Sequence, residues 1–168
     1  EVAIEAVRIA VTYMTPVLLL SDGYIGNGSE PFRIPDADDV PKIQCAFSDA
    51  EDGRKPFERD ELTLARPWIK PGTPGLENRV GGLEKAENTG NVSYDPINHE
   101  KMVQLREEKI NGIARTYAPL EVYGPEEGEV LVLGWGSTRG AIRGAVERFH
   151  REGKQVSHVH LRNIWPLP

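Results

Sequence analysis

The end of the chain carries the pattern that most constrains its fold, because two apolar runs flank an amphipathic segment there. Residues 129–133 predict a strand, and the glycines of 134–138 predict a tight turn after it. Ser137 is the expected N-cap of the following helix, and Gly153 lies just beyond its end. Residues 155–161 predict the next strand. The apolar face of the helix consists of Ala141, Ile142, Ala145, Val146 and Phe149. This β-α-β order predicts two parallel strands joined by a crossover helix.

A helix followed by an apolar run opens the chain. Residues 1–15 have apolar side chains at helical spacing, and Pro16 ends the pattern. Residues 16–20 are apolar throughout, which suits a strand buried on both faces of a parallel sheet. We therefore expect the second half of a β-α-β unit. Its first strand would precede this sequence, which also lacks an initial Met and stops directly after a strand, so we expect a piece of a longer protein.

Residues 23–95 show little periodicity and hold many Gly and Pro residues, as in 71–75. A structureless stretch of this length is uncommon in a compact domain, where connections run about 4–6 residues. It is too apolar for a solvated linker, with Phe47, Phe57, Leu62, Leu64, Trp68, Ile69, Leu76 and Leu83. We expect an extended arm that packs on its own chain or on another subunit.

Asp95 and Pro96 predict the N-cap and first turn of a helix that runs to about Ala114. Its expected apolar face consists of Met102, Val103, Ile110 and Ile113. Together these patterns predict an α/β fold, with parts of two open parallel-sheet domains joined by a long irregular arm.

Charge and cysteine content argue against several classes of function. The net charge of -6 provides no basic field for nucleic acid or an anionic membrane. The single cysteine, Cys45, cannot form an internal disulfide or by itself hold an iron–sulfur cluster or structural zinc. No signal-peptide pattern is present, and the run at 16–20 is far too short to cross a bilayer. A cytoplasmic, reducing setting is the simplest interpretation.

Polar residues directly follow the apolar run at 16–20. Ligands of open α/β sheets bind beyond the carboxyl ends of the strands. Asp22, Asn27, Ser29 and Glu30 are therefore candidates to lie next to a substrate or cofactor. The alternative is a glycine-rich turn whose polar groups satisfy its own backbone.

The turn after the strand at 129–133 is a candidate anion site, through the backbone amides of Gly134, Gly136, Ser137 and Thr138. Its spacing, G-x-G-x-x-x-G, departs from the dinucleotide fingerprint, and no acidic residue ends the next strand. A plain strand-to-helix turn is the alternative. His158 and His160 share a strand face at metal-ligand spacing, but no carboxylate or cysteine cluster accompanies them, so we expect no metal site.

Nine short strings, in order along the chain, resemble the alpha subunit of 2-oxoacid:acceptor oxidoreductases, the 2-oxoglutarate:ferredoxin type in particular. Two of them are Thr-Pro-Val-Leu-Leu-Leu-Ser-Asp-Gly-Tyr and Leu-Gly-Trp-Gly-Ser-Thr. The full set occupies 5–10, 15–24, 27–31, 65–67, 71–77, 81–85, 89–96, 98–102 and 133–138. One such string would be weak, but the ordered set spans almost the whole chain.

The resemblance implies an enzyme that uses thiamine diphosphate to decarboxylate a 2-oxoacid, passes electrons through iron–sulfur centres to ferredoxin, and forms an acyl-CoA. The alpha subunit of this family has a pyrimidine-binding domain followed by a transketolase-C-terminal-like domain. On that basis residues 1–30 end the first domain, 31–117 form the connecting arm and helix, and 118–168 begin the second. Arg79 and Lys85 could then meet an anionic group of a substrate or partner, or form part of an ordinary solvated or salt-bridged surface.

The resemblance also implies that catalytic groups lie outside this sequence. The beta subunit carries the diphosphate-binding domain, its magnesium and a cluster, and the glutamate that activates the pyrimidine lies upstream of this sequence. No catalytic residue is therefore assigned, and we expect the isolated chain to be inactive and to bind no cofactor alone. Expected partners are the beta subunit, with ferredoxin and coenzyme A for the whole complex, and exposed apolar surface should favour self-association. Two alternatives are a non-catalytic α/β scaffold and a free-standing nucleotide-binding module.

Overall fold

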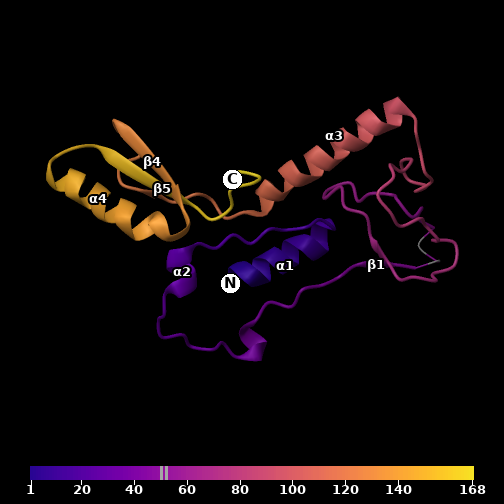
Figure 1. Ribbon diagram of the computed structural model, residues 1–168, viewed down its shortest axis with the longest axis horizontal. Helices are drawn as coiled ribbons and strands as arrows, with labels where there is room; N and C mark the ends of the chain where they lie inside the picture. Colours follow the sequence, from indigo (N-terminus) through magenta and orange to yellow (C-terminus); the bar gives the residue numbers. More distant parts are fainter. Residues whose placement is uncertain (50, 52) are drawn as a thin grey trace. The chain divides into compact units, whose positions relative to one another are not determined.

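The computed structural model describes residues 1–49, 51 and 53–168 of the chain. The chain divides into two compact units (Figure 1). Unit 1 comprises Glu1–Leu19 and Pro35–Ile113, and unit 2 comprises Leu20–Ile34 and Ala114–Pro168. Assignment of the chain to a pyrimidine-type and a transketolase-type domain stays a prediction.

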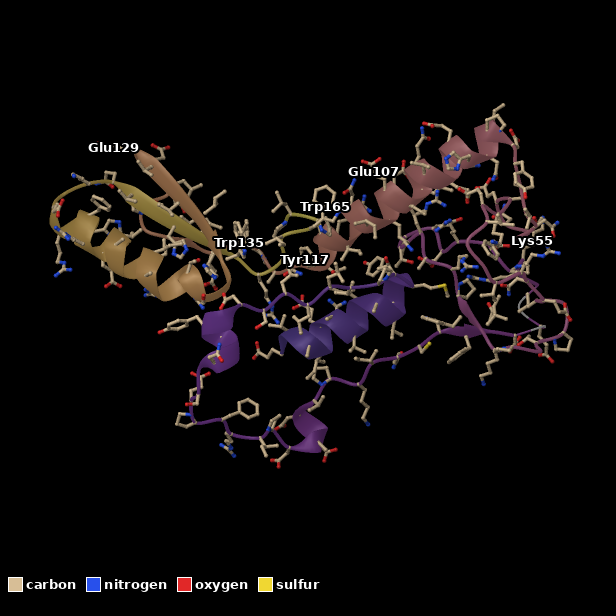
Figure 2. All side chains as sticks on the ribbon, in the orientation of Figure 1. Lys55, Glu107, Tyr117, Glu129, Trp135 and Trp165 are labelled. Atoms are coloured by element: carbon tan, nitrogen blue, oxygen red, sulfur yellow. The ribbon has the colours of Figure 1, made fainter. Side chains whose placement is uncertain are left out.

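Unit 2 contains the β-α-β unit that the sequence predicts. Strand β4 (Val130–Trp135) pairs in parallel with β5 (Val156–Leu161), in register from their first residues to their last. A 3-10 turn, η4 (Gly136–Thr138), and helix α4 (Arg139–Arg151) connect them. Figure 2 shows Glu129 before the start of β4 and Trp135 at its end. The prediction of a parallel α/β arrangement is confirmed.

The same sheet has a third strand that the sequence did not predict. Strand β3 (Val122–Tyr123) follows the 3-10 helix η3 (Ala114–Thr116) and pairs antiparallel with β5, which gives the order β3-β5-β4. Because β5 is central, its side chains are the best covered, and Val156 and Val159 are buried with Val146 of α4. The core of unit 2 therefore lies between β5 and one face of α4.

Two local predictions in unit 2 need correction. Ser137 does not cap α4, since the helix follows η4 directly, starts at Arg139 and has no side-chain cap. Ala141, Ala145 and Phe149, all expected on the apolar face of α4, are exposed, with Phe149 at 38%. The 3-10 turn shifts the helix start by one residue, and the small sheet covers only the middle of α4.

Unit 1 is built on α1 (Val2–Tyr13) and α3 (Pro96–Ile113). The predicted cap of α3 is confirmed, because Asp95 Oδ1 accepts the backbone N–H of Ile97 at 2.9 Å. Two-residue strands β1 (Phe47–Ser48) and β2 (Trp68–Ile69) pair in parallel. The buried apolar side chains of this unit are Ile9, Tyr13, Ala65, Leu76, Met102 and Ile113.

The carbonyl groups at the end of α1 are satisfied by specific donors. Met14 takes the left-handed conformation with φ 45°, and its N–H bonds back to Ala10. Trp68 Nε1 donates to the Val11 carbonyl at 2.8 Å, and Lys109 Nζ donates to the Met14 carbonyl at 3.2 Å. These bonds tie the arm and α3 to the end of α1.

The predicted strand at 16–20 is wrong, because these residues have no regular secondary structure. A strand needs a backbone partner, and no strand of the described residues pairs with this run. Leu18, Leu19 and Leu20 are 85%, 54% and 66% exposed. Val103 of α3, expected on the apolar face, is also 41% exposed. The apolar pattern is present at both places, but the described residues leave it exposed.

Over its described residues the segment 23–95 is irregular, as predicted, and holds only short elements. These are α2 (Gly23–Asn27), the 3-10 helix η1 (Ala37–Asp39) and the pair β1 and β2. Over the part of the chain that the structure describes, no helix is long and apolar enough to traverse a membrane.

Candidate functional site

The two polar regions that the sequence singles out in unit 2 meet at Asp22. Its Oδ1 accepts the backbone N–H groups of Tyr24 at 3.0 Å and Ile25 at 2.9 Å, so Asp22 is the N-cap of α2. Its Oδ2 accepts the backbone N–H of Ser137 at 3.0 Å. One carboxylate therefore joins the loop after residue 20 to the turn between β4 and α4.

Hydrogen bonds keep Asp22 ionised. The backbone N–H of Ile25 contributes most to lowering the pKa of the carboxyl to about 2. The side chain and backbone of Ser137 lower the pKa further and outweigh a small desolvation that would raise it. The turn thus holds an anion supplied by its own chain, and an external anion at this amide would compete with Asp22.

The glycines of the turn between β4 and α4 leave room for the Asp22 carboxylate and for helix α4. Gly136 has a left-handed φ of 64°, and a Cβ atom at this position would lie 3.0 Å from Asp22 Oδ2. A Cβ atom at Gly134 would overlap the Ile142 side chain of α4. Thr138 Oγ1 donates to the Trp135 carbonyl at 2.7 Å and closes the turn. Gly136 therefore admits the Asp22 carboxylate, and Gly134 admits helix α4.

The other predicted residues of the 21–30 loop lie on exposed chain. Asn27 Nδ2 donates to the Gly23 carbonyl at 2.6 Å, within α2 itself. Ser29 and Glu30 are exposed beyond the helix. Asp22 and Asn27 thus satisfy neighbouring backbone, while a role for Ser29 and Glu30 beside a ligand stays a prediction.

His160 belongs to the same site, which the sequence did not indicate. Its Nε2 lies 3.0 Å from the Gly136 carbonyl, and its Nδ1 lies 3.4 Å from His158 Nε2. Because a carbonyl only accepts, His160 carries its proton on Nε2 and its Nδ1 accepts from His158. Burial, and then the electrostatic interaction with the neighbouring His160, lower the pKa of His158, whose side chain is buried. The signal available was register: His160 stands opposite Gly134 in the parallel pair.

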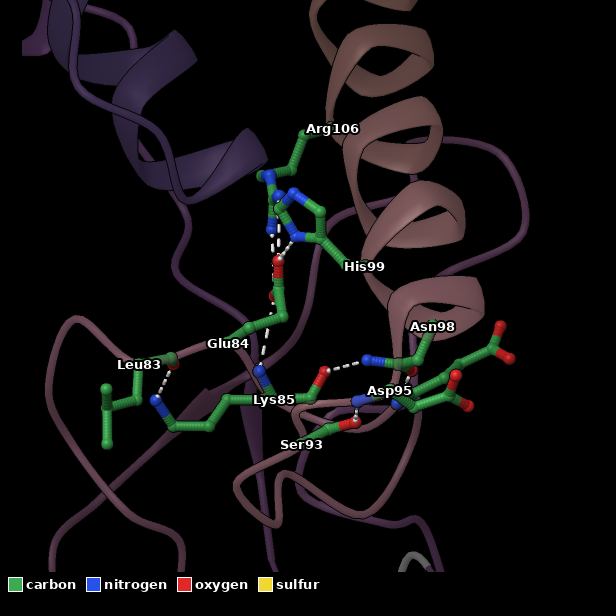
Figure 3. Close-up of polar contacts among 9 residues, drawn as sticks. Leu83, Glu84, Lys85, Ser93, Asp95, Asn98, His99 and Arg106 are labelled. Atoms are coloured by element: carbon green, nitrogen blue, oxygen red, sulfur yellow. Dashed lines mark hydrogen bonds and ion pairs between the residues drawn. The ribbon is translucent and has the colours of Figure 1, made fainter.

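In unit 1, the predicted residues Lys85 and Arg79 have different settings. Lys85 is 6% exposed, and its Nζ donates to the carbonyls of Gly81, at 3.0 Å, and Leu83. Figure 3 shows the lysine folded back on Leu83. Arg79 is exposed in a shallow groove lined by Glu77, Asn78, Arg79, Thr89, Gly90, Asn91 and Val92. Lys85 therefore fastens its own loop, while Arg79 is accessible.

A second polar cluster of unit 1 surrounds Glu84 and was missed in the sequence. Arg106 donates to both of its carboxylate oxygens, at 3.1 and 3.0 Å, and His99 Nδ1 lies 2.9 Å from Oε2 (Figure 3). Arg106 is the main cause that lowers the pKa of Glu84 to about 2. His99 and Arg106 lie seven residues apart and so share one face of α3. That spacing was the available signal.

Asn98 adds a second connection between this loop and α3. Its Nδ2 donates to the Lys85 carbonyl at 2.9 Å, and its Oδ1 accepts the Glu87 N–H at 3.1 Å. Lys101 forms an ion pair with Glu87. These contacts, drawn in part in Figure 3, anchor the glycine-rich segment 81–87 to the first turns of α3.

The described residues do not fit a metal ion or cluster. Within 1–49, 51 and 53–168, no group of three or more His, Cys, Asp or Glu side chains is placed to hold a metal. Cys45 is exposed, and one thiol does not suffice for an iron–sulfur cluster. We therefore derive no catalytic step through such a group on this chain.

Comparison with known proteins gives a consistent family. No protein-family model matches the chain. It is 52% identical, over 170 aligned positions and its whole length, to "2-oxoglutarate oxidoreductase subunit KorA" of Mycobacterium tuberculosis. It is 31% identical over 99% of its length to "2-oxoacid:ferredoxin oxidoreductase 1, subunit alpha" of Aeropyrum pernix. It covers 26% of each of these relatives, so the chain spans about a quarter of their length.

A solved structure agrees with these relatives. It is described as 2-oxoglutarate:ferredoxin oxidoreductase from Magnetococcus marinus with 2-oxoglutarate, coenzyme A and succinyl-CoA bound. The match has a TM-score of 0.82 and 33% sequence identity, and covers 96% of this chain and 28% of that chain. The resemblance inferred from the nine short strings is confirmed, as is the mixed α/β fold.

Proposed function

We infer that this chain, a homologue over its whole length of alpha subunits of 2-oxoacid oxidoreductases, forms part of an enzyme that oxidises a 2-oxoacid to an acyl-CoA. The observation that carries this proposal is the 52% identity over the full chain to a 2-oxoglutarate oxidoreductase subunit. The substrate we propose is 2-oxoglutarate, which the names of that relative and of the structural neighbour share.

These residues have a structural role in the enzyme, and they contact its other subunits. Their polar clusters at Asp22 and Glu84 join separate segments, and both carboxylates are occupied by donors of the chain itself. Exposed leucines at 18–20, and Leu131 and Leu133 on β4, require apolar neighbours. We propose that residues 1–30 complete a pyrimidine-type domain, that 31–117 connect, and that 118–168 begin a transketolase-C-terminal-like domain.

The cofactors and partners that the proposed reaction needs belong to the whole complex. We propose thiamine diphosphate, magnesium and an iron–sulfur cluster as its cofactors, held by residues other than those described here. Its partners are then a beta subunit, coenzyme A and ferredoxin, in the cytoplasm. Self-association through the exposed apolar surface is the expected behaviour of the chain without its partner.

A co-expression experiment tests the proposal. The alpha subunit that contains this sequence is produced with its beta subunit, and reduction of a viologen dye is followed with 2-oxoglutarate and coenzyme A. We expect reduction that requires both, and slower reduction with pyruvate or a branched 2-oxoacid. A complex that forms but reduces no dye with any 2-oxoacid would support a non-catalytic scaffold instead.

The isolated chain provides the matched control. Purified and mixed with thiamine diphosphate, it should reduce no dye with any 2-oxoacid. Turnover without added subunits would refute the assignment of a structural role to these residues.

A further inference from the structure

Three cationic side chains of unit 1 gather around the end of α1 and the loop before β2. Arg66 Nη2 lies 3.5 Å from Met14 Sδ, and Lys109 Nζ donates to the carbonyl of the same residue at 3.2 Å. The Arg66 guanidinium lies 3.8 Å from the centroid of the Phe57 ring, which fixes its plane. Met14 is therefore the point where cations from the arm and from α3 meet.

A tight loop places the third cation, Arg59. Its Nη1 donates to the Leu64 carbonyl at 2.7 Å, and Leu64 takes a left-handed φ of 54°. The Asp60 carboxylate accepts the N–H and hydroxyl of Thr63, both at 2.8 Å, and so holds the loop. Asp60 thus serves its own loop, although it is the acidic residue next to Arg59 in sequence.

Among the described residues, no carboxylate is in ion-pair contact with the cluster of Arg59, Arg66 and Lys109. Glu87, which favours the charge of Arg59 from a distance, is paired with Lys101. The nearby Glu84 is engaged by Arg106 and His99. The end of α1 offers only about half a negative charge, against three positive ones.

The cluster is also partly desolvated. All three side chains are half-buried. Burial lowers the pKa of Lys109 to about 8, and the charges of Arg59, Arg66 and Arg106 add to this effect. Burial likewise lowers the pKa of Arg59 and of Arg66. Like charges held together away from water are unfavourable unless an anion joins them.

We propose that Arg59, Arg66 and Lys109 form a binding site for a phosphate group. Two planar guanidinium groups and one ammonium suit a dianion with three oxygens, because each guanidinium can donate two parallel hydrogen bonds. A single carboxylate would neutralise only one of the three charges. Arg66 and Arg59 are preset by Phe57 and Leu64, so little side-chain freedom remains to be lost on binding.

Titration of the full 168-residue chain with inorganic phosphate tests the site. Phosphate is compared at pH 7 with chloride and acetate at equal ionic strength, by calorimetry and thermal unfolding. We expect phosphate to bind and raise the melting temperature, and Arg66→Gln and Lys109→Gln to weaken binding at least about tenfold. Lys101→Gln, on the same helix but paired with Glu87, should bind as the parent does. Equal effects of acetate, or unchanged binding by both site variants, would overturn the proposal.

A measurement on the unaltered chain keeps the test independent of how the variants fold. The Lys109 ammonium is titrated by NMR with and without phosphate. Bound phosphate should raise its pKa above about 8, because the dianion favours the charged form. An unchanged pKa at saturating phosphate would also rule out the site. Neither readout requires turnover, so a negative result here leaves the proposed oxidoreductase function untouched.

Discussion

The Asp22 carboxylate accepts the backbone N–H of Ser137 at 3.0 Å, across 115 residues of sequence. This bond uses the amide of a glycine-rich turn whose position after a predicted strand makes it a candidate anion site, although its glycine spacing departs from the dinucleotide fingerprint. The carboxylate also caps α2 through two further N–H groups. Asp22 is therefore a cap and a tertiary contact at once, and the loop that carries it is fastened to the carboxyl end of β4.

Replacing Asp22 with alanine removes the acceptor of three backbone N–H groups. We expect α2 to fray and the Ser137 amide to exchange faster with solvent, which hydrogen-exchange NMR would show. Asp22→Asn is the matched control, since its side-chain oxygen can still cap α2 without the charge. Unchanged exchange at Ser137 in the alanine variant would contradict the contact.

Protonation of the Asp22 carboxylate in acid should be visible at the Ser137 amide. The folded pKa of Asp22, about 2, is depressed below its ordinary value of 3.8. Its contribution to stability is therefore complete above pH 3.8 and is lost as the pH falls through about 2. The amide shift of Ser137 should titrate with a midpoint near 2, and a midpoint near 3.8 would show that the hydrogen bonds do not favour the ionised form.

Gly134→Ala should destabilise unit 2 by about 1–3 kcal/mol, because the added methyl group would overlap Ile142 of α4. Adding Ile142→Val removes the clashing Cδ1 atom and should restore part of the loss. Gly140→Ala, in the first turn of α4 with open space at its Cβ position, should be neutral or stabilising by up to about 1 kcal/mol. Urea unfolding measures all three, and an unaltered stability of Gly134→Ala would show that α4 can move away.

Several patterns that involve only neighbours in sequence predicted the structure correctly, although the predicted Ser137 cap of α4 did not form. The β-α-β unit and the Asp95 cap of α3 follow from local periodicity and local hydrogen bonding. Strand β3 and the fate of residues 16–20 depend instead on which distant backbone lies alongside. A two-residue strand has no periodicity to detect, and an apolar run becomes a strand only with a partner.

For the polar clusters too, some residues could be predicted from local sequence, but their contacts with distant residues could not. The candidates Asp22 and Ser137 could be chosen from their places after predicted strands, but their mutual contact could not. Glu84 carries no motif, and its role depends on two side chains of α3 that approach it in space. Residues that directly follow a predicted element could therefore be identified from the sequence. Residues whose role depends on tertiary contacts could not.

Glu84→Gln should lower the stability of unit 1 by about 1 kcal/mol, because the two hydrogen bonds from Arg106 lose their charged acceptor. The pKa of Glu84 is lowered from 4.5 to about 2, so this contribution is present above pH 4.5 and is lost as the pH falls through about 2. Urea unfolding should therefore separate parent and variant at pH 7 more than at pH 2. Glu107→Gln, exposed on α3 beside Arg106 (Figure 2), controls for the loss of a charge. Equal losses in both variants would assign the effect to net charge.

Because of Lys109, the free energy of unfolding of the chain should increase as the pH rises in the alkaline range. Its pKa falls from 10.5 to about 8 in the folded chain, chiefly through burial, and the charges of Arg59, Arg66 and Arg106 add to the shift. Between pH 8 and 10.5 the unfolded chain then binds more protons at this lysine than the folded chain. The free energy of unfolding consequently increases with pH through this group, and the cost of the buried charge is fully present below pH 8.

Comparison of the parent chain with Lys109→Met and Lys109→Arg isolates this lysine from other groups that titrate in the same range. Methionine carries no charge and arginine does not titrate there, so the difference between these two variants should be independent of pH from 8 to 10. The parent should resemble the arginine variant at pH 7.5 and gain stability relative to both as the pH rises. Urea unfolding at half-unit steps measures the three curves. A parent curve that stays parallel to the arginine curve would show that Lys109 keeps its proton, and hence that burial and the neighbouring cations together do not lower its pKa into this range.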